Sequence, residues 1–62
     1  MSFTIKQARK LGDKSQNEMA KALKVHVQTY RKIENNPRMA TIDQVKIIAE
    51  QTGLSFDQLF FG

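Results

Sequence analysis

Apolar residues recur every three or four positions along most of the chain, which is the spacing that lines one face of an α-helix. The pattern is clear at Met19, Ala20 and Leu23 and again over residues 42–52. No segment alternates between apolar and polar residues as a half-buried strand does. The sequence therefore predicts an all-α, compact fold of five helices, over residues 5–11, 16–23, 27–35, 42–52 and 56–61.

Four copies of one local motif set the predicted helix starts. In each copy a Ser or Thr is followed three residues later by Glu or Gln, so that the two residues can cap the first turn reciprocally. Gly12 is expected to end the first helix in the left-handed conformation, and Gly53 is expected to end the fourth helix. Pro37 follows the third helix, which it cannot continue. The capping pairs are Thr4 with Gln7, Ser15 with Glu18, Thr41 with Gln44, and Ser55 with Gln58.

The same periodicity predicts the core. Tyr30 and Ile33 share the inward face of the third helix. A chain of this size buries only about 60% of its unfolded surface, so the core is small. The first and fourth helices are expected to bury Ile5, Ala8 and Leu11, and Ile42, Val45, Ile48, Ala49 and Thr52, respectively.

The length and composition restrict the class of protein. Sixty-two residues suffice for one domain, expected over residues 1–62. The chain has no cysteine, which excludes disulfides and thiolate metal ligands. It has neither the ~20 apolar residues of a membrane span nor the apolar core of a signal peptide. We therefore expect a cytoplasmic protein without a membrane partner.

Positive charge is concentrated in the first part of the chain. Residues 1–36 hold eight Lys/Arg and three Asp/Glu, whereas residues 37–62 hold two Lys/Arg and three Asp/Glu. This asymmetry is typical of a face that binds a polyanion. Ordinary solvated lysines would produce the same balance, so charge alone leaves both interpretations open.

The stretch 16–35 resembles the helix-turn-helix of phage repressors and Cro proteins, the lambda-repressor-like or XRE family. The matching residues are Met19 and Ala20 in the fourth and fifth places, Leu23 in the eighth, Val25 in the tenth, and Ile33-Glu34 at the end. Arg9 and the closing TGLSFDQLF extend the likeness to nearly the whole chain. The resemblance implies a five-helix domain whose second and third helices form the helix-turn-helix. It also implies an ion pair between Arg9 and Glu34, with two solvated charges as the alternative.

The resemblance further implies how DNA would be contacted. In such folds the start of the third helix enters the major groove while the second helix crosses the phosphate backbone. Val27, Gln28 and Lys32 are expected to contact bases, at a thymine methyl, an adenine and a guanine respectively. Gln16 is expected to bond a phosphate. Backbone contacts, or contacts of unassigned kind, are expected from His26, Thr29, Arg31, Asn35, Arg38 and Lys10.

Several positions depart from the family pattern, namely Lys14, Lys24, His26, Tyr30, Asn36-Pro37 and Ala40. Lys24 stands where the turn usually has a left-handed Gly, which costs about 1 kcal/mol or forces another turn. His26 stands at the cap of the third helix, where it either caps that helix or touches a phosphate. Tyr30 replaces an Ile or Val, and its hydroxyl would need water or a phosphate.

These observations favour a sequence-specific transcriptional regulator of a bacterium or phage-infected cell. Because 62 residues leave no room for a separate oligomerisation or ligand domain, a Cro-like protein or minimal repressor is expected. Such proteins bind near-palindromic operators as dimers. The alternatives are a protein-binding module of the same fold, such as an antitoxin or antirepressor, and a fragment with a vestigial groove surface. The predicted dimer patch is Ile47, Phe56, Phe60 and Phe61.

The sequence offers little for catalysis. It has one histidine, no paired carboxylates at one site and no Gly-rich phosphate loop. We therefore expect no enzyme, no cofactor and no metal. The expected partners are double-stranded DNA and a second copy of the chain.

Overall fold

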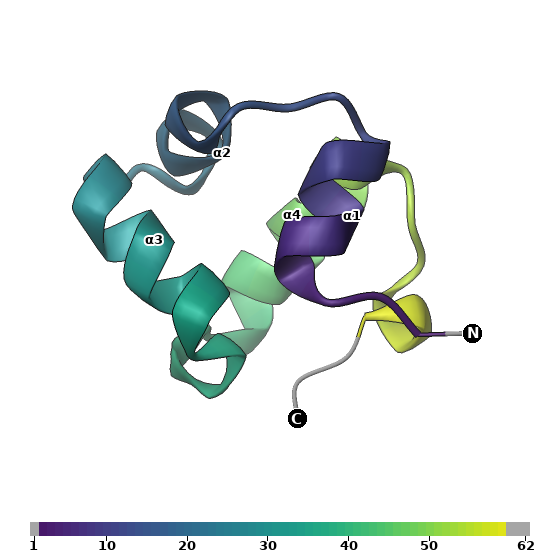
Figure 1. Ribbon diagram of the computed structural model, residues 1–62. Helices are drawn as coiled ribbons and strands as arrows, with labels where there is room; N and C mark the ends of the chain where they lie inside the picture. Colours follow the sequence, from purple (N-terminus) through teal and green to yellow (C-terminus); the bar gives the residue numbers. More distant parts are fainter. Residues whose placement is uncertain (1, 60–62) are drawn as a thin grey trace.

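The computed structural model describes residues 2–59, which form four α-helices and two single turns of 3₁₀ helix (Figure 1). The all-α prediction is confirmed, and the first four predicted helices have the predicted bounds. The elements are α1 (Ile5–Leu11), α2 (Gln16–Leu23), α3 (Val27–Asn35), η1 (Pro37–Met39), α4 (Ile42–Thr52) and η2 (Phe56–Gln58).

Reciprocal capping fixes the starts of three helices. The hydroxyl oxygens of Thr4, Ser15 and Thr41 accept hydrogen bonds of 3.0–3.1 Å from the backbone amides three residues later. The side chains of Gln7, Glu18 and Gln44 accept in return from the capping residues' own amides at 2.9 Å. These bonds satisfy amides that have no partner within the helix, which explains why a motif visible in the sequence located the boundaries.

The prediction of a fifth helix over residues 56–61 is wrong for the described part of that segment. Only the single turn η2 forms, and Gln58 supports it by accepting from the Ser55 amide at 2.9 Å. Leu59 is then extended and buried, and the Phe3 amide donates to the Gln58 carbonyl at 2.7 Å. A helical Leu59 would forfeit this bridge beside Phe3. Phe60 and Phe61 lie outside the described residues.

The core lies where α2 packs against α3 and α4, and where α1 packs against α4. Two predicted core residues are instead exposed, Leu11 at 62% and Ile42 at 67%. Each occupies a terminal position of its helix, Leu11 the last in α1 and Ile42 the first in α4, where the neighbouring helix no longer covers it. The buried apolar side chains are Ile5, Ala8, Met19, Ala20, Leu23, Tyr30, Ile33, Val45, Ile48, Ala49 and Leu59.

The glycine after α1 serves a different purpose from the predicted one. Gly12 has φ −81°, and the left-handed residue is Asp13 at φ 56°. A Cβ on Gly12 would lie 2.9 Å from the Cα of Thr52, so Gly12 permits the end of α1 to approach the end of α4. Gly53, by contrast, ends α4 as predicted, and it is left-handed at φ 76°.

Candidate nucleic-acid interface

The α2–α3 pair is joined by a tight turn without glycine. Lys24 adopts the left-handed conformation at φ 59°, and the Val25 amide donates to the Ala20 carbonyl at 3.0 Å. Ala20 is buried, and its small side chain allows α3 to pack closely over α2. The pair lies at one side of the molecule, while the N-terminal segment and η2 lie at the opposite side (Figure 1).

Helix α3 has one buried and one solvent-facing side. Tyr30 and Ile33 are in the core, and Val27 is half-buried against it. The remaining predicted contact residues of α3 are exposed and carry amide, hydroxyl or cationic groups, namely Gln28, Thr29, Arg31, Lys32 and Asn35. The predicted base and backbone contacts of this helix therefore share one polar, cationic surface.

His26 occupies the N-cap position of α3 with an extended backbone, but its side chain makes no capping hydrogen bond. The imidazole is exposed at the start of this surface. The capping role considered for His26 is therefore absent. Hydrogen bonding to the backbone amides is what makes Ser or Thr common at such positions, and α3 begins without it.

A buried ion pair fastens α3 to α1. Arg9 Nε lies 2.5 Å from Glu34 Oε2, and the two side chains are only 12% and 4% exposed. Arg9 Nη1 also donates to the Lys14 carbonyl at 3.0 Å. The guanidinium thus holds the end of α3, the loop before α2 and α1 together. Charge-assisted bonds of this kind are strong and directional.

Gln16 extends this ion pair to the surface. Its Nε2 donates to Glu34 Oε1 at 3.1 Å, and its Oε1 accepts from Arg31 Nε at 3.1 Å. Arg9, Glu34, Gln16 and Arg31 therefore form a continuous polar relay from α1 to the exposed side of α3. Sequence reasoning missed the bond between Gln16 and Arg31, because residues fifteen apart meet only once α2 and α3 have packed.

The comparison with known families identifies the kind of domain to which this surface belongs. A family model described as a helix-turn-helix matches residues 5–59. The chain belongs to this helix-turn-helix family. It is a DNA-binding domain of the Cro/C1 type, as the resemblance predicted. Searches of the curated proteins and of the solved structures gave no match.

The relay of this helix-turn-helix keeps Glu34 ionised. Burial by itself disfavours the carboxylate, but Tyr30, Arg9 and Gln16 outweigh that effect and hold the pKa of Glu34 below its ordinary value. Burial, and then the charge and proximity of Glu34, raise the pKa of Tyr30 far above its ordinary value. Among the described residues, the Tyr30 hydroxyl is the buried side-chain group that lacks a hydrogen bond of ordinary geometry, although it lies beside Glu34 and Arg9.

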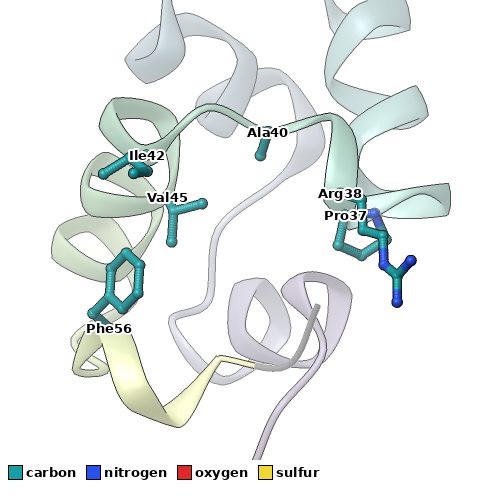
Figure 2. Close-up of a pocket in the computed structure, with 6 residues that line it drawn as sticks. All are labelled: Pro37, Arg38, Ala40, Ile42, Val45 and Phe56. Atoms are coloured by element: carbon teal, nitrogen blue, oxygen red, sulfur yellow. The ribbon is translucent and has the colours of Figure 1, made fainter. Parts of the chain in front are cut away.

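Two predicted backbone contacts lie outside the α2–α3 pair. Lys10 is exposed on α1. Arg38 is exposed on η1, directly after α3, and its side chain extends away from Ile42 and Val45 (Figure 2). Arg38 therefore follows the helix-turn-helix closely in sequence, whereas Lys10 belongs to α1, which precedes it.

An apolar groove lies beside the helix-turn-helix, between η1 and the start of α4. Figure 2 shows Ile42, Val45 and Phe56 on one wall and Pro37 on the other, with Ala40 between them. Of the predicted dimer patch, Phe56 is 46% exposed here, whereas Ile47 is half-buried and packs on the core. Phe60 and Phe61 lie outside the described residues. The groove also contains Ile42, which the predicted patch did not include.

Over residues 2–59, no helix is long and apolar enough to cross a membrane. Within the same range, no three His, Cys, Asp or Glu side chains come together as a metal ion would require.

Proposed function

We propose that this helix-turn-helix protein is a sequence-specific transcriptional regulator, Cro-like or a minimal repressor, that inserts α3 into the major groove of a near-palindromic operator. The observation that carries the proposal is the exposed polar and cationic side of α3, held in place by buried Tyr30 and Ile33. A regulator of this kind acts on DNA in the cytoplasm of a bacterium or a phage-infected cell. Its activity is binding and not catalysis.

Three side chains are proposed to read bases. Gln28 can accept and donate at the N6 and N7 edge of adenine, and Lys32 can donate to O6 and N7 of guanine. Val27, half-buried at the start of α3, offers methyl groups to a thymine methyl. Gln16, His26, Thr29, Asn35, Arg38 and Lys10 are proposed to fix the register through the sugar-phosphate backbone.

We further propose that the protein binds as a homodimer, because one α3 contacts too few bases for a specific operator. The apolar groove with exposed Ile42 and half-exposed Phe56 supports this proposal. A dimer on the operator would exclude polymerase sterically. The same groove favours the second candidate function, a protein-binding module of the antitoxin or antirepressor class, in which another protein occupies it.

Selection of bound sequences from random DNA tests the proposal. A two-fold symmetric site with half-sites about one helical turn apart is expected. The Gln28→Ala variant should lose about 1–3 kcal/mol of binding free energy on the selected site and little on other DNA. Equal losses on every duplex would contradict base reading by Gln28. No sequence enrichment with the wild-type protein would favour the protein-binding alternative.

A further inference from the structure

We propose that Arg31 is a tethered phosphate clamp, set on the DNA backbone by Gln16, and does not read bases. The inference deepens the proposed function and rests on it for the presence of DNA. Arg31 lies on the exposed side of α3 between the proposed base readers Gln28 and Lys32. Position alone would make it a fourth base reader, but its hydrogen bond to Gln16 Oε1 directs it elsewhere.

The orientation of the Gln16 amide follows from its two partners. Glu34 is ionised and only accepts, so it faces the amide nitrogen at 3.1 Å. Arg31 only donates, so it faces the amide oxygen at 3.1 Å. If the Gln16 amide were rotated by half a turn, its oxygen would face the Glu34 carboxylate and its NH₂ group would face the Arg31 guanidinium, and neither pair could form a hydrogen bond. The buried Glu34 therefore determines where Gln16 presents its acceptor, and hence where the guanidinium is held.

The tether leaves most of the guanidinium free to bind an anion. Arg31 uses only Nε–H in its bond to Gln16, and its four Nη–H donors remain in a planar fork that suits two phosphate oxygens. Gln16 is the first residue of α2, the helix that crosses the DNA backbone in this fold. Holding Arg31 against that residue moves its charge from the bases toward the phosphates.

Lys32 provides the contrast. It is exposed on the same helix, and over residues 2–59 its side chain makes no hydrogen bond or ion pair. An untethered side chain must lose its rotamer freedom when it binds, whereas Arg31 has lost part of that freedom already. Arg31 is therefore a positioned backbone contact, and Lys32 keeps the freedom to reach a base edge.

A double-mutant cycle on DNA tests the clamp. Dissociation constants are measured over a range of salt for wild type, Arg31→Ala, Gln16→Ala and the double variant, on the selected duplex and on a scrambled one. Arg31→Ala should weaken binding about tenfold on both duplexes and reduce the log–log salt slope by about 0.9. After Gln16→Ala, adding Arg31→Ala should cost clearly less than tenfold, because the clamp has lost its tether.

Lys32→Ala is the matched control, since it should change the preference at one base and add independently to Gln16→Ala. A change of base preference in Arg31→Ala, or simple additivity with Gln16→Ala, would overturn the clamp. If wild type shows no sequence preference, the proposed function fails. The coupling and the salt slope on scrambled DNA still decide the clamp in that case.

Nuclear magnetic resonance of the free protein tests the tether without DNA. The Arg31 Nε–H should give a resonance protected from solvent exchange in wild type and in Lys32→Ala, and unprotected in Gln16→Ala. Circular dichroism of each variant checks that the helices remain. An Arg31 Nε–H that exchanges equally fast with and without Gln16 would overturn the proposal.

Discussion

Within residues 2–59, two residues other than glycine adopt left-handed backbone conformations, and they flank α2. Asp13 precedes the helix at φ 56° and Lys24 follows it at φ 59°. Crowding of Cβ against the carbonyl costs about 1–2 kcal/mol in this region, and Asp is tolerated better because its short side chain can bond locally. Lys24 has no such compensation, so the turn is held by the burial of Ala20 and Leu23 before it.

Replacing Lys24 by glycine should therefore raise the free energy of unfolding. We expect a gain of about 1 kcal/mol, because the relief of backbone strain exceeds the extra chain entropy of glycine. Urea titration of Lys24→Gly measures it, and Asp13→Gly, expected to gain less, is the matched control. A gain at Asp13 that equals or exceeds that at Lys24 would contradict the strain argument.

Gly12 and Gly53 should respond to substitution for opposite reasons. Gly12→Ala should cost about 2 kcal/mol through overpacking, because the new Cβ would meet the Cα of Thr52 at 2.9 Å. Gly53→Ala meets no atom within 4 Å, but its φ of 76° should cost about 1 kcal/mol. Thermal unfolding of Asn variants separates the causes. Asn should recover stability at position 53 and none at position 12.

At the scale of the elements, the sequence predicts where the helices begin better than it predicts the side-chain contacts between them. The helix bounds follow from local capping at Thr4, Ser15 and Thr41, which is why the sequence predicts them. The length of the last helix does not follow, since Ser55 and Gln58 start a turn but the burial of Leu59 ends it. The helical spacing of the apolar residues in α3 predicts which of its side chains face solvent. The Gln16–Arg31 bond depends on tertiary packing and on the side chains of this particular chain.

The ionised Glu34 should make stability depend on acid pH. Its pKa is below the ordinary 4.5 in the folded protein, so the folded state favours the carboxylate. The resulting stabilisation is present above about pH 4.5 and is lost as the pH falls through the lower, folded value. Glu34→Gln should reduce the free energy of unfolding by about 3 kcal/mol at pH 7, since it leaves Arg9 buried without its counter-charge.

Urea titrations at several pH values compare the two proteins, with sucrose added so that both remain folded at zero urea. The difference between wild type and Glu34→Gln should shrink below about pH 4.5. Glu18, whose pKa its bonds to Ser15 also lower, is the same in both proteins and cancels from this difference. A difference that stays constant down to low pH would contradict the role assigned to Glu34.

At the scale of the whole molecule, the described residues form at least two exposed apolar surfaces, which are lined by different side chains. One is the groove with Ile42 and Phe56, and the other surrounds Leu11 together with Phe3. The groove adjoins η1, directly after α3, whereas Leu11 ends α1. We propose that a second copy docks at the groove, where it would help to set the spacing of the two α3 helices.

Sedimentation equilibrium tests this assignment. The double variant Ile42→Ser/Phe56→Ser should weaken self-association at least about tenfold, and operator affinity with it. Leu11→Ser removes an equally exposed apolar side chain from the other surface and should leave both unchanged. Loss of association in Leu11→Ser alone would move the dimer contact to α1.

The bridge between Phe3 and Leu59 has a practical consequence for how the protein can be extended. It brings two ends of the described chain together, with the Phe3 amide 2.7 Å from the Gln58 carbonyl. The N-terminal segment and η2, which these residues adjoin in the chain, lie on the side of the molecule away from α3 (Figure 1). A reporter or tethering domain fused before Phe3 or after Leu59 would start from that side and leave α3 clear. A short peptide joining the two positions would make circular permutation feasible, with new termini opened in an exposed loop.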